Sequence, residues 1–105
     1  MKFHPLSEKY EKEIRENAKK VGLDKIDFDK RYYVTKIKSK SSGRELDEFK
    51  IRGEPCLLGN EDFLKLYFNS ISEWFMTSLV VSTEKDGDNY IVETENSTYL
   101  LEMER

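Results

Sequence analysis

The alternation of apolar and polar residues is clearest near the end of the chain. The segment "NYIVETENSTYLLEM", residues 89–103, alternates, breaks at Asn96-Ser97 and then alternates again. Such a pattern predicts two half-buried β-strands joined by a tight turn. Asp86-Gly87 is a second two-residue turn signal just upstream. The sequence therefore predicts a C-terminal three-stranded antiparallel meander.

The two turns predict a consistent set of faces for this meander. They pair Thr83 with Tyr90 and Tyr90 with Met103, and a slip of one residue in either hairpin would reverse the faces of a strand. The face expected to pack on the core comprises Leu79, Val81, Thr83, Tyr90, Val92, Thr94, Tyr99, Leu101 and Met103. The opposite face mixes aliphatic and acidic residues: Val80, Ser82, Glu84, Ile91, Glu93, Glu95, Thr98, Leu100 and Glu102.

Apolar residues at helical spacing predict a first helix over residues 7–21. Ser7 is the expected N-cap and Gly22 the expected stop. The apolar stripe is narrow, so this helix is expected to lie on the surface. The stripe consists of Tyr10, Ile14, Ala18 and Val21, with Leu6 just before it.

Residues 61–77 are the most apolar segment and predict a second, central helix. Asn60 is its expected N-cap. Trp74 is expected to be largely buried, because it falls on the apolar face of that helix. That face consists of Leu64, Tyr67, Phe68, Ile71, Trp74 and Phe75.

Two further strands are expected between the helices. Residues 31–38 are rich in β-branched and aromatic residues, and residues 46–52 alternate and could pair with them. The segment "GEPCLLGN", residues 53–60, is expected to be a connection, because it contains glycine and proline. The predicted fold is thus one α+β domain over residues 1–105. It has two helices and a C-terminal three-stranded antiparallel meander plus one or two further strands.

Composition narrows the class of protein. Charged residues make up 37% of the chain, and no apolar run has the length of roughly 20 residues that a membrane span requires. The single cysteine and the lack of an apolar signal core favour a cytoplasmic location without membrane association. Residues 1–50 carry 14 Lys/Arg and 10 Asp/Glu, whereas residues 51–105 carry 4 and 11. The simplest explanation is that the two halves attract each other or are solvated faces.

The chain lacks the residue sets of common active sites. A nucleophile needs an adjacent base, yet the only histidine is His4 and the only cysteine is Cys56. Zinc sites need clustered cysteine and histidine, and "EKDGDNYIVETE" lacks the order of a calcium loop. The five glycines are scattered and form no phosphate-binding loop. No catalytic residue, metal or cofactor is expected, and the protein is expected not to be an enzyme.

A basic segment suggests nucleic-acid binding as an alternative. Basic residues mixed with aromatics on a strand are typical of proteins that bind single strands. A pI of about 5.3, however, is well below the basic value expected of such domains. The candidate residues are Arg31, Lys36, Lys38, Lys40 and Arg44, beside Tyr32 and Tyr33.

The C-terminal hairpin has a V-x-T-x-N-S-x-Y-x-L pattern, formed by Val92, Thr94, Asn96, Ser97, Tyr99 and Leu101. In this pattern the chain resembles small accessory proteins of bacteriophages and mobile elements of low-GC Gram-positive bacteria. The resemblance implies a binding protein that inhibits a host protein, in the host cytoplasm. Host defence proteins are among such targets, which makes an anti-CRISPR function a candidate.

The expected function is therefore non-enzymatic binding of a host protein through the acidic face of the meander. A nucleic-acid-binding host protein is one candidate partner. Some inhibitors of this class imitate nucleic-acid phosphates. The chain is expected to act as a monomer or a small homo-oligomer. The candidate partner-binding residues are Glu84, Asp86, Asp88, Ile91, Glu93, Glu95 and Glu102.

Overall fold

Seven segments of the described chain pair through their backbones into a single antiparallel sheet. The structure, a computed structural model, describes residues 1–39, 50–70 and 73–104. Within these ranges the strand order is β4-β3-β2-β1-β7-β6-β5, and all neighbouring strands are antiparallel. The strands are β1 (Tyr32–Ser39), β2 (Lys50–Gly59), β3 (Leu64–Asn69), β4 (Trp74–Met76), β5 (Val80–Asp86), β6 (Asn89–Thr94) and β7 (Ser97–Met103).

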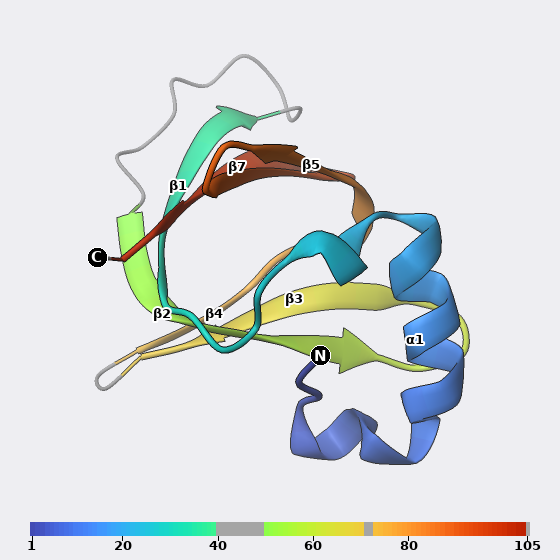
Figure 1. Ribbon diagram of the computed structural model, residues 1–105. Coiled ribbons are helices and arrows are strands. Elements are labelled where there is room, and N and C mark those ends of the chain that lie inside the picture. The colour runs from blue at the N-terminus through green and yellow to red at the C-terminus, as the bar shows by residue number, and fades with distance from the viewer. Residues whose placement is uncertain (40–49, 71–72, 105) are drawn as a thin grey trace.

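The helical part of the described chain is small. A 3₁₀ helix η1 (Pro5–Tyr10) leads directly into α1 (Glu11–Lys20), and a short η2 (Leu23–Lys25) follows. The predicted fold of two helices with a three-stranded meander is therefore wrong. The described residues form mostly a seven-stranded antiparallel sheet, with the continuous η1–α1 segment and the short η2 beside it (Figure 1).

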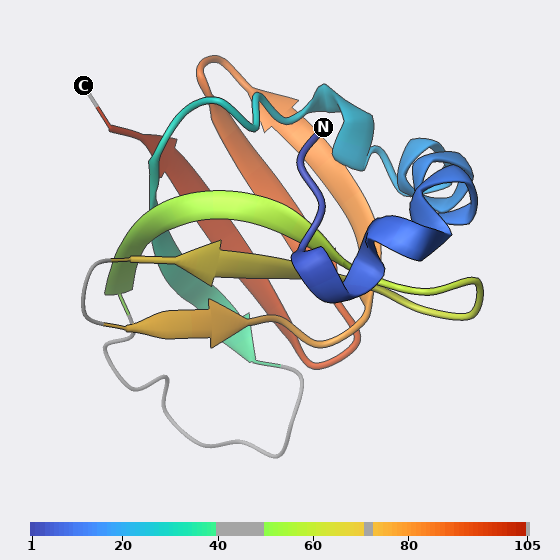
Figure 2. The same ribbon diagram turned by 90° about the horizontal axis from the view of Figure 1, so that it is seen from below.

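The sheet folds into two layers because β2 is shared between them. The first part of β2 pairs with β1, from Lys50 to Gly53, and the part from Glu54 to Gly59 pairs with β3. Figure 2 shows this long, curved strand running from one layer to the other. A Cβ atom at Gly53 would lie 2.7 Å from the carbonyl oxygen of Asn69, so the close approach at the bend requires glycine.

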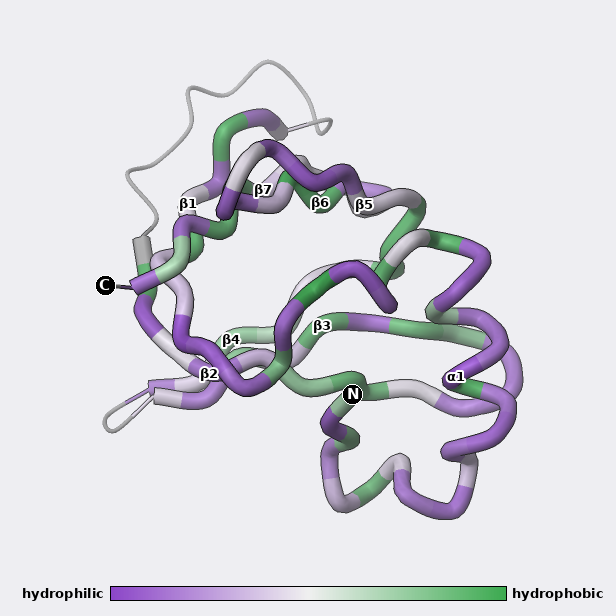
Figure 3. The backbone as a smooth tube through the Cα atoms, viewed as in Figure 1, coloured by the Kyte–Doolittle hydropathy of each residue, from purple (hydrophilic) through white to green (hydrophobic). Residues whose placement is uncertain are grey.

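We call the layer of β1, β7, β6 and β5 the large layer and that of β3, β4 and the end of β2 the small layer. The core lies between them, and α1 lies at the side opposite the β1–β2 bend (Figure 1). The helical segment is mostly hydrophilic in Figure 3, and it buries only a narrow stripe that includes Ile14 and Ala18. The fully buried apolar side chains of the core are Ile14, Ala18, Leu23, Tyr32, Val34, Leu57, Leu66, Phe68, Val92 and Leu101.

The first predicted helix is present, with different capping. The ring nitrogen Nδ1 of His4 accepts a hydrogen bond from the backbone N–H of Leu6, so His4 caps η1. Ser7, the predicted N-cap, is buried and its hydroxyl accepts from the backbone N–H of Gly59 at 2.8 Å. Leu6 is 75% exposed and does not extend the apolar stripe. The predicted stop at Gly22 is confirmed by its φ of 77°.

The predicted central helix over residues 61–77 is wrong. Leu64, Leu66 and Phe68 are buried with less buried residues between them, which is the two-residue period of a strand. Asn60, the predicted N-cap, accepts with its side chain from the backbone N–H groups of Asp62 and Phe63 at 2.7 and 3.2 Å. The same capping chemistry here forms an Asx turn between β2 and β3.

Two other sequence predictions for the middle of the chain have different outcomes. The strand expected at residues 31–38 is confirmed as β1, and it pairs with β2 through Val34 and Ile51. The connection expected at residues 53–60 is wrong, because all but the last of these residues belong to β2. Residues 46–49 lie outside the described part.

The three C-terminal strands pair consecutively, with registers shifted from those predicted. Thr83 is opposite Val92 rather than Tyr90, and Tyr90 is opposite Leu101 rather than Met103. The first turn consists of Gly87-Asp88, one residue later than expected. Moving a turn by one residue shifts the pairing by two, which keeps each side chain on its predicted face.

One strand of the meander departs from the predicted faces. A β-bulge between Val80 and Ser82 interrupts the pairing of β5 with β6. As a result Val80 is buried and Val81 is 48% exposed, the reverse of the prediction. The remaining buried members of the predicted inward face are Thr83, Tyr90, Val92, Thr94, Tyr99 and Leu101.

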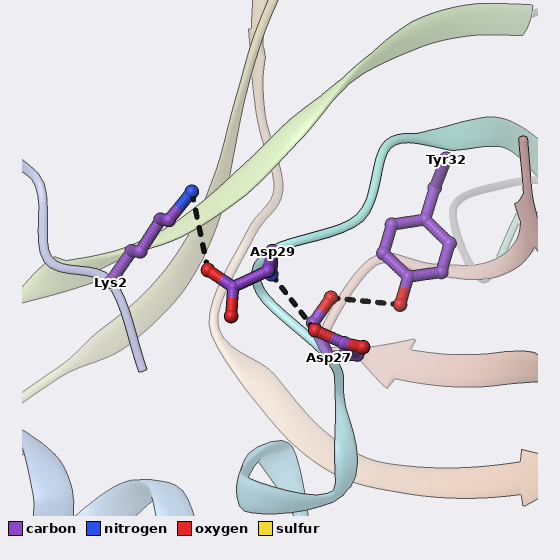
Figure 4. Close-up of polar contacts among 4 residues, drawn as sticks. All are labelled: Lys2, Asp27, Asp29 and Tyr32. Carbon is purple, nitrogen blue, oxygen red and sulfur yellow. Dashed lines mark hydrogen bonds and ion pairs between the residues drawn. The ribbon is translucent and has the colours of Figure 1, made fainter.

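Polar contacts hold the segment before β1 against the N-terminal residues (Figure 4). The Tyr32 hydroxyl donates to the backbone carbonyl of Asp27 at 2.9 Å, and the side chain of Asp27 accepts from the N–H of Asp29 at 2.9 Å. The Asp29 carboxylate lies 3.6 Å from the Lys2 ammonium. Burial raises the pKa of Tyr32 above its ordinary value, so its hydroxyl remains a donor.

Candidate functional site

The outer surface of the large layer brings together residues from four strands, and we call it the outer face. Directly opposed residues on neighbouring strands share a face, so the register identifies its members. Leu100 on β7 is opposite Thr35 on β1 and Ile91 on β6, and Ile91 is opposite Glu84 on β5. Ile91 and Leu100 are only partly buried. They form a small aliphatic centre on this face.

Carboxylates lie around this aliphatic centre. Glu93 is opposite Thr98 on one side of it, and Glu102 is opposite Tyr33 on the other. Glu84 is exposed, and the Ser82 hydroxyl is 3.4 Å from Glu93 Oε2. The outer face therefore has an apolar centre with an acidic rim, the arrangement that many protein interfaces use.

The structure groups only part of the predicted partner-binding set. Glu84, Ile91, Glu93 and Glu102 share the outer face. Three other carboxylates lie at the ends of hairpins and are exposed: Asp86, Asp88 and Glu95. Asp86 ends β5 and Asp88 lies in the β5–β6 turn, whereas Glu95 belongs to the β6–β7 turn.

The predicted basic site is dispersed. Lys38 is exposed on β1 opposite Thr98, so it belongs to the same outer face as Glu93. Lys36 is opposite the buried Tyr99, and its ammonium lies 5.9 Å from the centre of that ring. Lys40 and Arg44 lie outside the described residues. The acidic and basic surfaces proposed as rivals are therefore neighbours in space.

An ion-pair cluster around Glu104 joins this residue of the acidic half to Arg31 of the basic half and to Arg52 of its own half. Arg31 Nε lies 3.7 Å from Glu104 Oε2, and Arg52 Nη1 lies 3.2 Å from Glu104 Oε1. All three side chains are at least partly exposed, so the pairs contribute little stability. Arg31, a predicted nucleic-acid contact, is thus already partnered by a carboxylate.

An aromatic cluster on the small layer was missed by the sequence interpretation. Trp74 stacks on Tyr67 with ring centres 5.9 Å apart and planes 10° from parallel. The His4 ring meets Tyr67 edge-on at 4.8 Å. Trp74 is 64% exposed, although it was expected in the core. Interpreting "LKLYF" with a period of two would have placed Tyr67 on the outer side.

The residues of thiol and metal chemistry do not assemble an active centre in the described part of the chain. Burial raises the pKa of the Cys56 thiol to about 11, while nearby Lys2 acts in the opposite direction. A thiol with so high a pKa is a poor nucleophile at neutral pH. No group of three or more His, Cys, Asp or Glu side chains suited to a metal ion occurs among the described residues.

We expect Cys56 to react slowly with iodoacetamide. The ordinary thiol pKa of 9.0 rises to about 11 in the folded protein, and each pKa unit lowers the thiolate fraction about tenfold. Alkylation at pH 8 should therefore be about 100-fold slower in the folded than in the urea-unfolded protein, as followed by mass spectrometry. The pKa of Cys56 is higher in the folded than in the unfolded protein. Its contribution to the free energy of unfolding is therefore fully present below pH 9 and is lost as the pH rises toward 11.

Cys56 is the only cysteine, so alkylation reports on one site. Equal rates in the folded and unfolded states would contradict the buried, unreactive thiol. We also expect Cys56→Ala to leave partner binding unchanged.

None of the helices among the described residues has the length and apolar character needed to cross a bilayer. Compared with protein-family models, curated proteins and solved structures, the chain shows no significant match.

Proposed function

We propose that this protein is a non-enzymatic binding module that recognises another protein through its outer face. The observation that carries the proposal is the aliphatic pair Ile91 and Leu100, opposed on β6 and β7 and partly exposed at the middle of the face. A partner that covers this pair would remove apolar area from water, at about 25 cal/mol for each Å² buried.

The rim indicates the chemistry of that partner. Glu84, Glu93 and Glu102 lie around the aliphatic pair, and Asp86 extends the acidic strip along β5. A basic protein surface complements this rim and would associate faster because opposite charges steer encounters. The resemblance of the C-terminal hairpin to phage accessory proteins makes a host protein the proposed partner. A nucleic-acid-binding host protein would present the required basic surface.

Nucleic-acid binding remains the alternative, with less support from the geometry. Of its five candidate residues, Arg31 is paired with Glu104 and Lys36 packs beside Tyr99, whereas Lys38 is exposed on the outer face. Acidic residues on the same face would repel phosphates. Binding of DNA or RNA is therefore the rival outcome of the experiment that follows.

The experiment reverses charge on the outer face. We expect a Glu84→Lys, Glu93→Lys double variant to weaken binding of a purified partner at least tenfold, or about 1.4 kcal/mol. The loss should be larger at low salt, because ions screen exposed charges. Affinity is measured by calorimetry on the host protein first isolated with the wild-type chain.

The matched control is Glu13→Lys, Glu16→Lys, which makes the same charge change at exposed positions of α1. It should bind like the wild type if the effect is specific to the outer face. If both double variants weaken partner binding equally, the loss of affinity comes from the change in net charge and not from the outer face. Loss of binding in Lys36→Glu, Lys38→Glu alone, with DNA or RNA as the ligand, would support the nucleic-acid alternative.

A further inference from the structure

A groove of about 300 Å³ lies where four parts of the chain meet. These parts are the end of α1, the β2–β3 turn, the start of β5 and the β6–β7 turn. Its apolar lining includes Val21, Phe63, Leu79 and Val81, each of which is at least partly exposed. The groove is large enough for one or two side chains and lies at the lower limit of small-molecule pockets.

The β-bulge in β5 gives this groove its exposed apolar wall. It buries Val80 and leaves Val81 48% exposed beside the groove. Bulges commonly redirect side chains next to functional sites. A regular β5 would bury Val81 and remove the most exposed aliphatic group of the groove.

The charges around the groove favour a cationic ligand. Glu61, Asp62 and Glu95 are exposed at its rim, and Lys20 is the only basic residue of the lining. None of the three carboxylates forms an ion pair with a residue in the described ranges. The C-terminal end of α1, which also borders the groove, carries partial negative charge from the helix dipole.

Hydrogen bonds hold the walls of the groove in place. Asn17 on α1 donates from its side chain to the backbone carbonyl of Glu61 at 3.4 Å. The backbone N–H of Glu95 donates to the carbonyl of Leu79 at 2.9 Å, which ties the β6–β7 turn to the chain entering β5. A preformed groove loses little entropy when a ligand enters it.

We propose that this groove takes an aliphatic or aromatic side chain flanked by lysine or arginine from the bound partner protein. The apolar wall accepts the uncharged side chain, and the three rim carboxylates accept the flanking cations. Glu95 belongs both to this rim and to the acidic set predicted from the sequence. The inference rests on the proposed function, because it names the segment of a protein partner that the chain recognises.

The test uses a bead-displayed library of random octapeptides and the labelled full-length protein. The wild type should enrich peptides that place Lys or Arg next to Leu, Ile, Val or Phe. Val81→Asp and Glu95→Lys should each lower this enrichment at least tenfold. Leu6→Asp, which makes a matched change at an exposed aliphatic position outside both the groove and the outer face, should retain it. Chemical-shift changes on adding an enriched peptide should centre on Val21, Phe63 and Val81.

The inference is overturned if the wild type enriches no peptides, enriches acidic or uncharged ones, or enriches the same peptides as Val81→Asp. Such a result leaves the proposed function intact when Glu84→Lys, Glu93→Lys still weakens binding of the purified partner. The converse result is that the wild type enriches the expected peptides while Glu84→Lys, Glu93→Lys binds the purified partner like the wild type. That result would support the groove and overturn the outer face as the main contact. The two failures are therefore distinguishable.

Discussion

We expect Phe68→Ala to lower the free energy of unfolding by about 3–5 kcal/mol, the usual cost of removing a large buried aromatic side chain. Phe68 is fully buried on β3, between the sheet layers. This loss is a large part of the roughly 5–15 kcal/mol that stabilises a domain. Urea unfolding followed by circular dichroism measures it.

Trp74→Ala is the control, because the helix predicted from the sequence placed Phe68 and Trp74 on one buried face. In the structure Trp74 is 64% exposed, and its ring stacks on Tyr67. Its replacement should cost at most about 1.5 kcal/mol, the upper value for an aromatic pair. Similar large losses from both substitutions would contradict the strand assignment and favour the helix.

A second large effect is expected at Gly22. A Cβ atom there would lie 2.8 Å from the carbonyl oxygen of Thr83, and the residue has a φ of +77°. Alanine in this left-handed conformation costs roughly 1–2 kcal/mol. Relieving the clash with the β5 backbone adds about 1–3 kcal/mol, as for an overpacked core. Thermal and urea unfolding should both report the combined loss.

Gly87 provides the matched control for this prediction. Its φ is +63°, but a Cβ atom there would meet nothing within 4 Å. Gly87→Ala should therefore show only the conformational cost of roughly 1–2 kcal/mol. Equal losses at the two glycines would mean that the turn after α1 does not pack on β5 as closely as the structure shows.

The pairing of β1 with β7 brings residues of the basic first half of the chain beside residues of the acidic second half. Arg31 of the first half lies 3.7 Å from Glu104 of the second half, whereas Arg52, which also contacts Glu104, belongs to the second half itself. Part of the charge asymmetry therefore reflects attraction between the two halves of the chain. This is one of the two simple explanations given from the sequence. The carboxylates Glu84 of β5 and Glu93 of β6 lie farther along the sheet, on the outer face.

The sequence by itself determined the features that depend on neighbouring residues. The alternation of residues 90–101 placed Tyr90, Val92, Tyr99 and Leu101 on the buried side, although both turns were misplaced by one residue. Gly22 marked the end of the helix because its positive φ is a local requirement. The carboxylates of the outer face were found by the same alternation. These predictions survive because a shift of two in pairing does not change faces.

The tertiary structure alone decided the features that depend on distant partners. The apolar run of residues 61–77 fits a helix by its spacing, but pairing of β3 with β2 and β4 makes it two strands. The bend in β2 and the bulge at Val81 likewise arise where the sheet folds around its core. The groove needs four segments that are far apart in the chain. No local pattern encodes these features, because long-range hydrogen bonding and burial outweigh local propensity.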